Sequence, residues 1–209
     1  RGVHAAGGLA LKRILDVIFA LAGLAVFSPL LLMAAWLVKK SGPGPVFYRG
    51  VRAGLYGKPF RIFKFRTMVV NAEQQGGPTT GTRDPRVTRA GWFLRRTKMD
   101  ELPQLINVLL GDMRLVGPRP EVMVYTSRYA GDEKLILSMR PGITDYASIV
   151  FANLDDRVGS QDADAYFQQH ILPEKNRLRI KYVREWSLGG DLKILWSTVW
   201  RVLKRGFGQ

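Results

Sequence analysis

The chain is organised around residues 95–120, RRTKMDELPQLINVLLGDMRLVGPRP. Two adjacent carboxylates, Asp100 and Glu101, stand directly before an apolar run in which leucine and isoleucine recur at the spacing of a helix with one buried face. Pro103 is tolerated only in the first turn of such a helix, where its missing N–H costs nothing. The pattern therefore predicts a helix start here, with Asp100 at or near the N-cap, kept ionised by the helix dipole.

The residues that flank this helix start favour a functional site over a simple cap. Arg95 lies just upstream, and Arg119 follows between two prolines that stiffen its backbone. The guanidinium fork of arginine matches phosphate oxygens in a bidentate way. A carboxylate among such groups is suited to a phosphorylated substrate, and its attack on phosphorus would give an aspartyl-phosphate-type intermediate. From the residues alone, both interpretations, helix cap and phosphate site, stay open.

Three linked motifs carry a family resemblance. The central stretch, with FKFRTM (63–68) before it and RPGIT (140–144) after it, resembles the bacterial sugar transferases that prime glycan assembly, which are monotopic phosphoglycosyl transferases acting on polyprenyl phosphate. The resemblance covers residues 12–203. It implies that Asp100 is the nucleophile on the phosphorus of a nucleotide-activated sugar and that Glu101 is its acid/base or metal-binding neighbour. Five basic residues are candidates for binding substrate phosphates: Lys64, Arg66, Arg95, Arg119 and Arg140.

The resemblance also implies a reaction and a cofactor. A sugar phosphate would pass from a UDP-sugar to polyprenyl (undecaprenyl) phosphate, with release of UMP, through a covalent phosphosugar ester of Asp100. This would be the first membrane step in making an exopolysaccharide, an O-antigen or a glycoprotein. Mg²⁺ is expected because a diphosphate donor needs a cation with hard oxygen ligands, and Asp100 or Glu101 would hold it. After RPGIT the family usually continues with Gly and an aromatic residue, whereas this chain has Asp145 and Tyr146, a change that bears on donor choice.

Composition agrees with a phosphate-binding membrane protein. The chain has 209 residues, enough for one domain with a substantial core. It has a net charge of +15 and no cysteine, which predicts a polyanionic partner and excludes thiolate chemistry and disulfides. We expect residues 1–10 to be an expression remnant or a flexible start, and we leave them out of the fold prediction.

An apolar run, residues 14–38, decides between the polyanionic partners. It is long enough to span a bilayer as a straight helix, but Ser28 and Pro29 interrupt it near the middle. Basic pairs at 12–13 and 39–40 flank it, and both ends would prefer the anionic cytoplasmic surface. We therefore predict a re-entrant helix–break–helix, in which Ser28 satisfies the backbone carbonyl that Pro29 frees. The resemblance implies the same hairpin; a proline-kinked spanning helix is the alternative.

The remaining segments predict a small amount of sheet and several helices. Two β-type runs, 46–52 and 60–68, are joined by a turn around Gly54 and Gly57, and a polar loop follows at 71–89. His170 has no metal-binding neighbours in the sequence and is read as structural or exposed. Helical patterns cover residues 121–139, 173–185 and 191–203; the last is amphipathic, and three tryptophans in this region (186, 196 and 200) allow either a core-facing or a membrane-interfacial helix.

The combined prediction is a compact α+β domain, mostly helical, on a membrane hairpin. Residues 11–40 would form the hairpin and residues 41–209 the catalytic domain, on the cytoplasmic face of the bacterial inner membrane. The expected partners are the donor, the lipid acceptor and anionic lipids, without nucleic acid; a homodimer is left open. Two other classes compete: a nucleic-acid-binding module, which does not explain the apolar run, and a membrane scaffold, which gives no role to Asp100 and Glu101.

Overall fold

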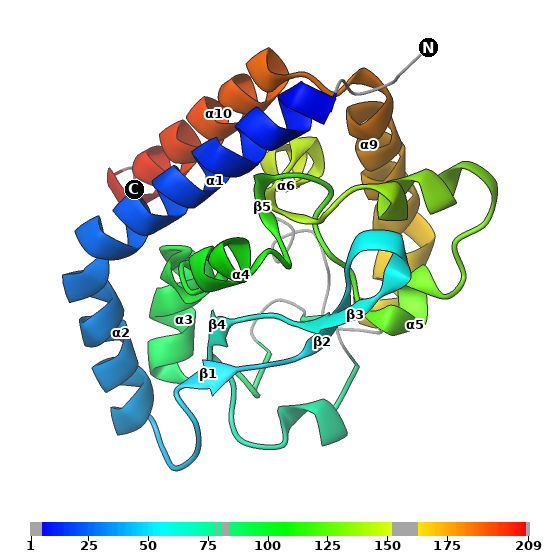
Figure 1. Ribbon diagram of the computed structural model, residues 1–209. Coiled ribbons are helices and arrows are strands. Elements are labelled where there is room, and N and C mark those ends of the chain that lie inside the picture. The colour runs from blue at the N-terminus through cyan, green and yellow to red at the C-terminus, as the bar shows by residue number, and fades with distance from the viewer. Residues whose placement is uncertain (1–5, 78, 81–83, 152–162, 208–209) are drawn as a thin grey trace.

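The computed structural model describes residues 6–77, 79–80, 84–151 and 163–207. Helices dominate it, and the strands form three short two-stranded sheets within the described part of the chain (Figure 1). The prediction of a mostly helical α+β chain is therefore confirmed. The larger core joins five elements: α1 (Ala6–Val26), α4 (Gln104–Leu110), β5 (Arg114–Val116), α9 (Leu172–Glu185) and α10 (Leu188–Phe207). Its most deeply buried side chains include Val108, Met113, Tyr182 and Ile194.

The N-terminal apolar run forms two helices, α1 (Ala6–Val26) and α2 (Ser28–Lys40), with axes bent by 64° at the break. Pro29 has no N–H to donate to the carbonyl of Ala25, and the Ser28 hydroxyl donates to that oxygen instead, at 2.8 Å. The predicted break and its local hydrogen bond are both confirmed. Among the described residues, no single helix is long and apolar enough to cross a membrane. The two helices of this bent pair reach that length and apolar character only when they are taken together.

Three side chains of α1 attach this helix to the rest of the molecule. Lys12 forms a buried ion pair with Asp191, and Asp16 pairs with Arg114 at 3.3 Å. Arg13 donates to the carbonyl oxygen of Leu109 at 3.0 Å, at the C-terminal end of α4. The charges of residues 12–13 are therefore bonded within the molecule, whereas the sequence prediction assigns them, with residues 39–40, to the anionic membrane surface. The charged side chains of α1 are buried where the helix packs on the domain. Burying a charge is costly unless it is paired, and residues of the domain provide the partners.

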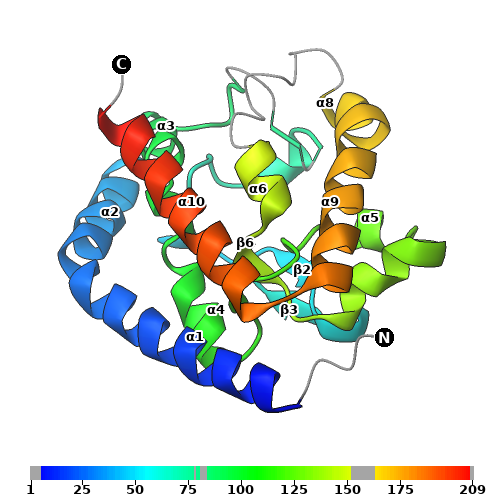
Figure 2. The same cartoon turned by 90° about the horizontal axis from the view of Figure 1, so that it is seen from above.

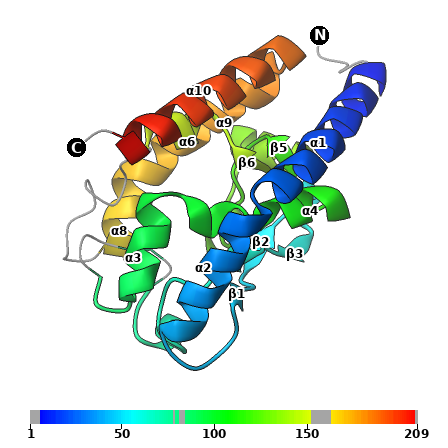
Figure 3. The ribbon, with the colours of Figure 1, turned by 90° about the vertical axis from the view of Figure 1, so that its left-hand side faces the viewer.

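At the other end of the hairpin, α2 is held through its C-terminal carbonyl groups. The buried Arg66 donates to the carbonyl oxygen of Gly42 at 2.9 Å and to that of Val38 at 3.4 Å. Lys39 and Lys40, in contrast, are exposed. Figure 3 shows the hairpin from its outer side, with α2 in front of α3 and β1.

The two predicted β-type runs form an interrupted antiparallel hairpin. Strand β1 (Phe47–Tyr48) pairs with β4 (Lys64–Phe65), and β2 (Val51–Ala53) pairs with β3 (Pro59–Arg61). The turn between β2 and β3 contains the 3₁₀ turn η1 (Leu55–Gly57) and closes where Gly54 N–H donates to the carbonyl oxygen of Lys58 at 2.8 Å. The runs and their glycine turn are confirmed, with shorter strands than the pattern suggested.

The third sheet is parallel and joins distant segments. Strand β5 (Arg114–Val116) pairs with β6 (Gly142–Thr144). Directly after β5, Gly117 N–H donates to the carbonyl oxygen of Thr144 at 3.0 Å, and Gly142 N–H donates to that of Pro118 at 3.0 Å. A Cβ atom on Gly142 would lie 2.1 Å from the nitrogen of Gly117, so only glycine allows this approach. The pairing fixes the backbone that leads into Arg119.

The helix predicted at 121–139 is wrong as a single element. The chain instead forms α5 (Met123–Thr126) and the 3₁₀ helix η4 (Gly131–Ser138). Ala130, between the two elements, has an extended backbone (φ −125°, ψ 160°), and Gly131, at φ +50°, then begins η4 in a left-handed conformation that an α-helix does not accommodate. The sequence pattern of residues 121–139 shows no break at this point, and it therefore predicts one helix.

The C-terminal helices agree with the pattern. The predicted helices 173–185 and 191–203 are found as α9 (Leu172–Glu185) and α10 (Leu188–Phe207). Seen from above in Figure 2, α10 runs beside α6 (Tyr146–Val150). The other described helical elements are η2 (Ala72–Gln74), α3 (Arg89–Arg96), η3 (Met99–Glu101), α4 (Gln104–Leu110), α8 (Ala163–Tyr166) and the π-helical turn η5 (Phe167–Ile171).

Candidate active site

The adjacent carboxylates lie in η3, a 3₁₀ turn between α3 and α4. Lys98 enters this turn in a left-handed conformation, at φ +59°. Pro103, not Asp100, occupies the N-cap position of α4 and gives it no side-chain cap. The prediction that Asp100 caps the apolar helix is therefore wrong. The helix starts later because Leu102 N–H bonds to the carbonyl oxygen of Met99, at 3.3 Å, in the tighter 3₁₀ pattern.

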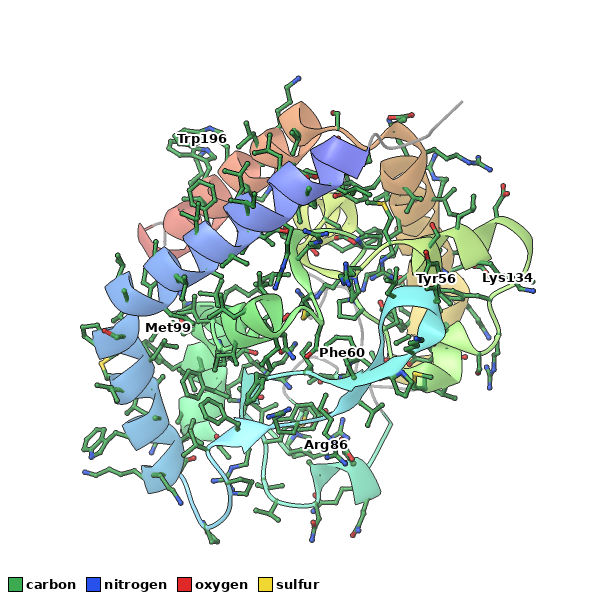
Figure 4. All side chains as sticks on the ribbon, viewed as in Figure 1. Tyr56, Phe60, Arg86, Met99, Lys134 and Trp196 are labelled. Atoms are coloured by element: carbon green, nitrogen blue, oxygen red, sulfur yellow. The ribbon has the colours of Figure 1, made fainter. Side chains whose placement is uncertain are left out.

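The η3 turn packs directly against the membrane-type hairpin. Met99 joins an apolar cluster with Ala34 and Val38 of α2, and with Phe65 and Leu94. Figure 4 labels Met99 between the ribbons of α2 and α4. The two carboxylates that follow it are thereby placed next to the hairpin.

Asp100 is buried without any hydrogen bond from the described residues. The residue as a whole is 7% exposed, and its Oδ1 atom is buried and accepts no hydrogen bond from the described residues. Burial and the neighbouring charge of Glu101 raise the pKa of Asp100 to about 6, against the opposing effect of Lys64 and other nearby cations. The prediction that the start of the helix keeps Asp100 ionised is therefore wrong: its pKa is raised, and Pro103 occupies the N-cap of α4.

Glu101 has the opposite environment. Its Oε1 atom accepts hydrogen bonds from Nζ of Lys64, at 3.1 Å, and from Nη2 of Arg119. Burial alone would raise the pKa of Glu101, but the charges of Arg119 and Lys64 outweigh it and hold the pKa well below its usual range. Two neighbouring carboxylates therefore differ: Asp100 exchanges its proton near neutral pH, while Glu101 stays ionised.

Arg119 is held at both its backbone and its side chain. Its backbone N–H donates to Oδ2 of Asp145 at 2.9 Å, and Nη1 donates to the carbonyl oxygen of Ile143 at 2.5 Å. The remaining Nη2 reaches Glu101. The prolines on either side restrict the backbone further. Arg119 thus presents a guanidinium group of fixed orientation beside Glu101.

Two more of the candidate basic residues lie around this pair. Lys64 comes from β4 and bonds to Glu101. Arg95 comes from α3, donates from Nε to the hydroxyl of Thr67 at 2.9 Å, and lies close enough to lower the pKa of Asp100. The structure therefore brings Lys64, Arg95 and Arg119 together from three separate elements.

The other two candidates do not join the cluster. The guanidinium group of Arg66 is committed to the carbonyl groups at the end of α2. Arg140 has an exposed side chain that forms no hydrogen bond or ion pair with the described residues. Its backbone carbonyl packs against Gly117, so it contributes to the sheet that supports Arg119.

Sequence reasoning missed a second buried layer behind Arg119. Asp145, noted only as a departure from the family pattern, is 0% exposed and accepts the Arg119 amide. Arg179, also 0% exposed, pairs with Glu121 at 2.7 Å and with Asp145 at 3.4 Å. No signal in the sequence relates these residues, because they lie on α9, on the loop after Pro120 and at the start of α6, and the fold alone brings them together.

The site offers few protein ligands for a metal ion. Within the described part of the chain, no group of three or more His, Cys, Asp or Glu side chains is arranged to hold a cation. The carboxylate oxygens of Asp100, whose Oδ1 is unpartnered, and of Glu101 are available as ligands in the described part of the site. Such a set suits Mg²⁺, which binds through one or two carboxylates and takes its other ligands from water and substrate phosphates.

Comparison with known proteins identifies relatives along the whole chain. A family model described as bacterial sugar transferase matches residues 8–205. The chain is 39% identical, over 91% of its length, to the UDP-glucose:undecaprenyl-phosphate glucose-1-phosphate transferase of Escherichia coli (strain K12), and 40% identical, over 90%, to a protein of the same name from Caulobacter vibrioides. It is 37% identical, over 95%, to the UDP-N-acetylgalactosamine-undecaprenyl-phosphate N-acetylgalactosaminephosphotransferase of Aeromonas hydrophila.

These relatives are longer proteins. The chain spans 40% of the Escherichia coli protein, 44% of the Aeromonas protein and 68% of the Caulobacter protein. The matching part includes all the residues of the site described above, from Lys64 to Arg179.

Proposed function

The chain belongs to the bacterial sugar transferase family, and from this premise we propose that it transfers a sugar 1-phosphate from a UDP-sugar to undecaprenyl phosphate. The products would be UMP and a lipid-linked diphosphate sugar, the first membrane intermediate of a glycan. The observation that carries the proposal is the environment of Asp100: a buried carboxylate, free of hydrogen bonds from the described residues, with the cations Lys64 and Arg95 near it and the Arg119–Glu101 pair at the next residue.

In the proposed mechanism Asp100 acts as a nucleophile. An ionised oxygen of Asp100 attacks the sugar-proximal phosphorus of the donor and forms an acyl phosphate ester, while the bond to the distal phosphate breaks and UMP leaves with the electron pair. An oxygen of undecaprenyl phosphate then attacks the same phosphorus and displaces Asp100. A carboxylate with a pKa of about 6 is ionised at neutral pH and is more basic, and so more nucleophilic, than an ordinary aspartate.

The other residues of the site would bind and orient the phosphates. Arg119 and Lys64 supply positive charge at the donor's diphosphate, where negative charge grows as UMP leaves. Glu101 stays ionised and holds both cations in place. Arg95 adds charge near Asp100 and favours its ionised form.

We propose Mg²⁺ as the cofactor, held by Asp100 and Glu101. The unpartnered Oδ1 of Asp100 is a hard oxygen ligand of the kind that Mg²⁺ requires. When bound, the ion neutralises the charge of the donor's diphosphate. Removal of divalent ions with EDTA should abolish UMP release, and added Mg²⁺ should restore it.

We further propose that the α1–α2 hairpin enters and leaves the cytoplasmic leaflet of the inner membrane from one side. Both of its ends are attached to the same domain, through Lys12 and Asp16 at one end and through Arg66 at the other. Between them lie many exposed apolar side chains, including Ile18, Phe19, Leu21, Val26, Leu32, Met33 and Trp36. Large exposed apolar surfaces of this kind are typical of sites that contact a membrane or another protein.

Helix α10 would lie at the same membrane surface. Its exposed face carries Trp196 (71% exposed) and Trp200 (52% exposed), with Leu192 and Val199 beside them. Figure 4 shows Trp196 pointing away from the molecule on the side where α1 also lies. Tryptophan favours the boundary between head groups and acyl chains. Of the two alternatives left by the sequence, the interfacial helix therefore has the better support.

The test of the proposed function is a turnover assay. The purified protein, in detergent or nanodiscs, is mixed with undecaprenyl phosphate, Mg²⁺ and one of a panel of UDP-hexoses and UDP-N-acetylhexosamines. We expect release of UMP together with an equal amount of lipid-linked sugar diphosphate for at least one donor. Release of UMP without lipid product would indicate a hydrolase instead, and no release with any donor would refute the proposal.

A further inference from the structure

A buried ionic cluster lies behind the proposed site and has no part in the mechanism described so far. Arg179 of α9 is its centre, with 0% exposure. Its Nη2 donates to Oε1 of Glu121 at 2.7 Å, and its Nε donates to Oδ2 of Asp145 at 3.4 Å. Burying a charge is costly unless partners compensate it, so this arrangement requires a compensating structural role or a functional one.

The two carboxylates bonded by Arg179 lie on either side of Arg119. Glu121 is two positions after Arg119 in the chain, separated from it by Pro120. Asp145 accepts the backbone N–H of Arg119 directly, at 2.9 Å. Arg179 therefore bonds to two carboxylates that adjoin the backbone of Arg119, whose guanidinium group would bind the donor's phosphates.

We propose that Arg179 and Asp145 are positioning residues for residues 117–121, here called the Arg119 loop. They hold this loop so that the Arg119 guanidinium group is oriented toward the donor's diphosphate. This inference rests on the proposed function, since it assigns Arg119 a phosphate to bind. It does not make either residue catalytic, because both act through Arg119. It also gives the departure from the family pattern at Asp145 a physical meaning.

The hydrogen bonds of Asp145 require a carboxylate. Its Oδ1 accepts from the backbone N–H of Ser148 at 2.6 Å and from the Ser148 hydroxyl at 2.7 Å. Its Oδ2 accepts from Arg119 and Arg179. An asparagine has an NH₂ group in place of one of the two oxygens. That NH₂ group would face either the two Ser148 donors or the Arg119 and Arg179 donors, and it cannot accept a hydrogen bond from them. Asp145→Asn keeps the size of the side chain but removes the negative charge that binds Arg179 and the Arg119 backbone, so we expect residues 117–121 to loosen.

A matched control lies in the same cluster. Lys175 is also buried (8% exposed), and its Nζ donates to the same Oε1 of Glu121 at 3.1 Å. Lys175 has no hydrogen bond to Asp145 or to Arg119 among the described residues. Lys175→Met therefore removes a buried cation from the cluster but leaves the anchor of Arg119 intact.

The experiment is a double-mutant cycle on UMP release. Asp145→Asn and Arg179→Met are each made in the wild type and in an Arg119→Lys background, and kcat/KM is measured for the UDP-sugar. We expect each single variant to lose at least tenfold, mainly through a higher donor KM, and to lose less than threefold more once Arg119 is already replaced. Lys175→Met should stay within threefold of the wild type. Residues that act through one another give non-additive effects, whereas independent residues do not. If each substitution lowers kcat/KM by the same factor in the Arg119→Lys background as in the wild type, the inference is overturned.

A second measurement does not depend on activity. Amide hydrogen exchange of the peptide that contains residues 117–121 should increase in Asp145→Asn and Arg179→Met, and should stay unchanged in Lys175→Met. Unchanged exchange in the first two variants would also overturn the inference. If the wild type shows no turnover at all, the proposed function fails, and the exchange result alone decides the positioning role. Should Arg179→Met fail to fold, Asp145→Asn carries the test.

Discussion

At the residue scale, the site separates two neighbouring carboxylates by their surroundings. Glu101 is bonded to two cations and stays ionised, whereas Asp100 is buried without a hydrogen bond and has a pKa near 6. A group whose pKa is raised by folding destabilises the folded state when it is ionised. Asp100 thus has the signature of a residue whose placement serves chemistry at the expense of stability.

The first prediction concerns Asp100→Asn. This variant should lose all turnover, because an amide cannot act as the nucleophile, and should still fold. Asp100 has a pKa of about 6 in the folded state and 3.8 as its ordinary value, so its ionisation costs stability at pH 8 and costs nothing below pH 4. The variant should therefore be more stable than the wild type at pH 8, by roughly 2–3 kcal/mol, and equally stable near pH 4. Denaturant unfolding at both pH values measures this; residual turnover above a few per cent would contradict the covalent mechanism.

The second prediction compares two fully buried side chains on α4. The amide of Gln104 has no hydrogen-bond partner among the described residues at either atom, and Asn107 bonds to Phe63 N–H at 2.7 Å and to the carbonyl oxygen of Arg61 at 2.9 Å. Unsatisfied buried polar atoms cost about 1–3 kcal/mol each. Gln104→Met, of similar size, should therefore raise the melting temperature, whereas Asn107→Leu should lower it. A lower melting temperature for Gln104→Met would show that its amide is satisfied, for example by buried water.

At the element scale, some features follow from local sequence and others do not. The break at Ser28 and Pro29 could be predicted, because proline disrupts a helix wherever it occurs. The interruption of helix 121–139 at residues 127–130 could not, since tertiary packing overrides local propensity and makes Ala130 extended before η4 begins. The 3₁₀ turn around Asp100 also depends on neighbours, as η3 packs against α2, α3 and β4.

The third prediction concerns the contact of α3 with the strand that precedes it. A Cβ atom on Gly91 would lie 1.9 Å from the carbonyl oxygen of Thr67, an oxygen that also accepts Thr88 N–H at 3.0 Å. Gly91→Ala should therefore displace α3 and destabilise the fold by about 1–3 kcal/mol or more. The matched control is Gly189→Ala in α10, where nothing lies within 4 Å and alanine should be neutral or stabilising. Equal melting temperatures of the two variants would contradict the tight approach at Gly91.

At the scale of the whole molecule, long-range ion pairs hold the hairpin and the site in one unit. The sequence contains Lys12, Asp16, Arg114 and Asp191 as separate charges, and only the fold pairs them. For the same reason the sequence indicated the carboxylates and Arg119 but not Arg179, whose partners come from remote segments. Local patterns therefore predicted the elements and the centre of the site, whereas the second layer and the attachment of the hairpin required the tertiary structure.

The last prediction concerns topology. Each uncharged arm of the hairpin, residues 17–26 and 28–38, reaches about 15–17 Å at roughly 1.5 Å per residue, about half of a hydrocarbon core. Its N-terminal end is held on the domain side by Lys12 and Asp16. A cysteine introduced at the exposed Ala10, in a chain with no other cysteine, should therefore react with an impermeant maleimide only from that side.

Straightening the hairpin should not by itself reverse this labelling. Ser28→Ala with Pro29→Leu removes the break and makes the run long enough to span, but the ion pairs of Lys12 and Asp16 remain and oppose the movement of the N-terminus. Adding Lys12→Ala and Asp16→Ala should release it, and labelling in oriented membrane vesicles should then move to the far side. Labelling of the parent protein from the far side would instead establish a kinked spanning helix. A reversal caused by the Ser28 and Pro29 substitutions alone would show that the ion pairs do not hold the hairpin.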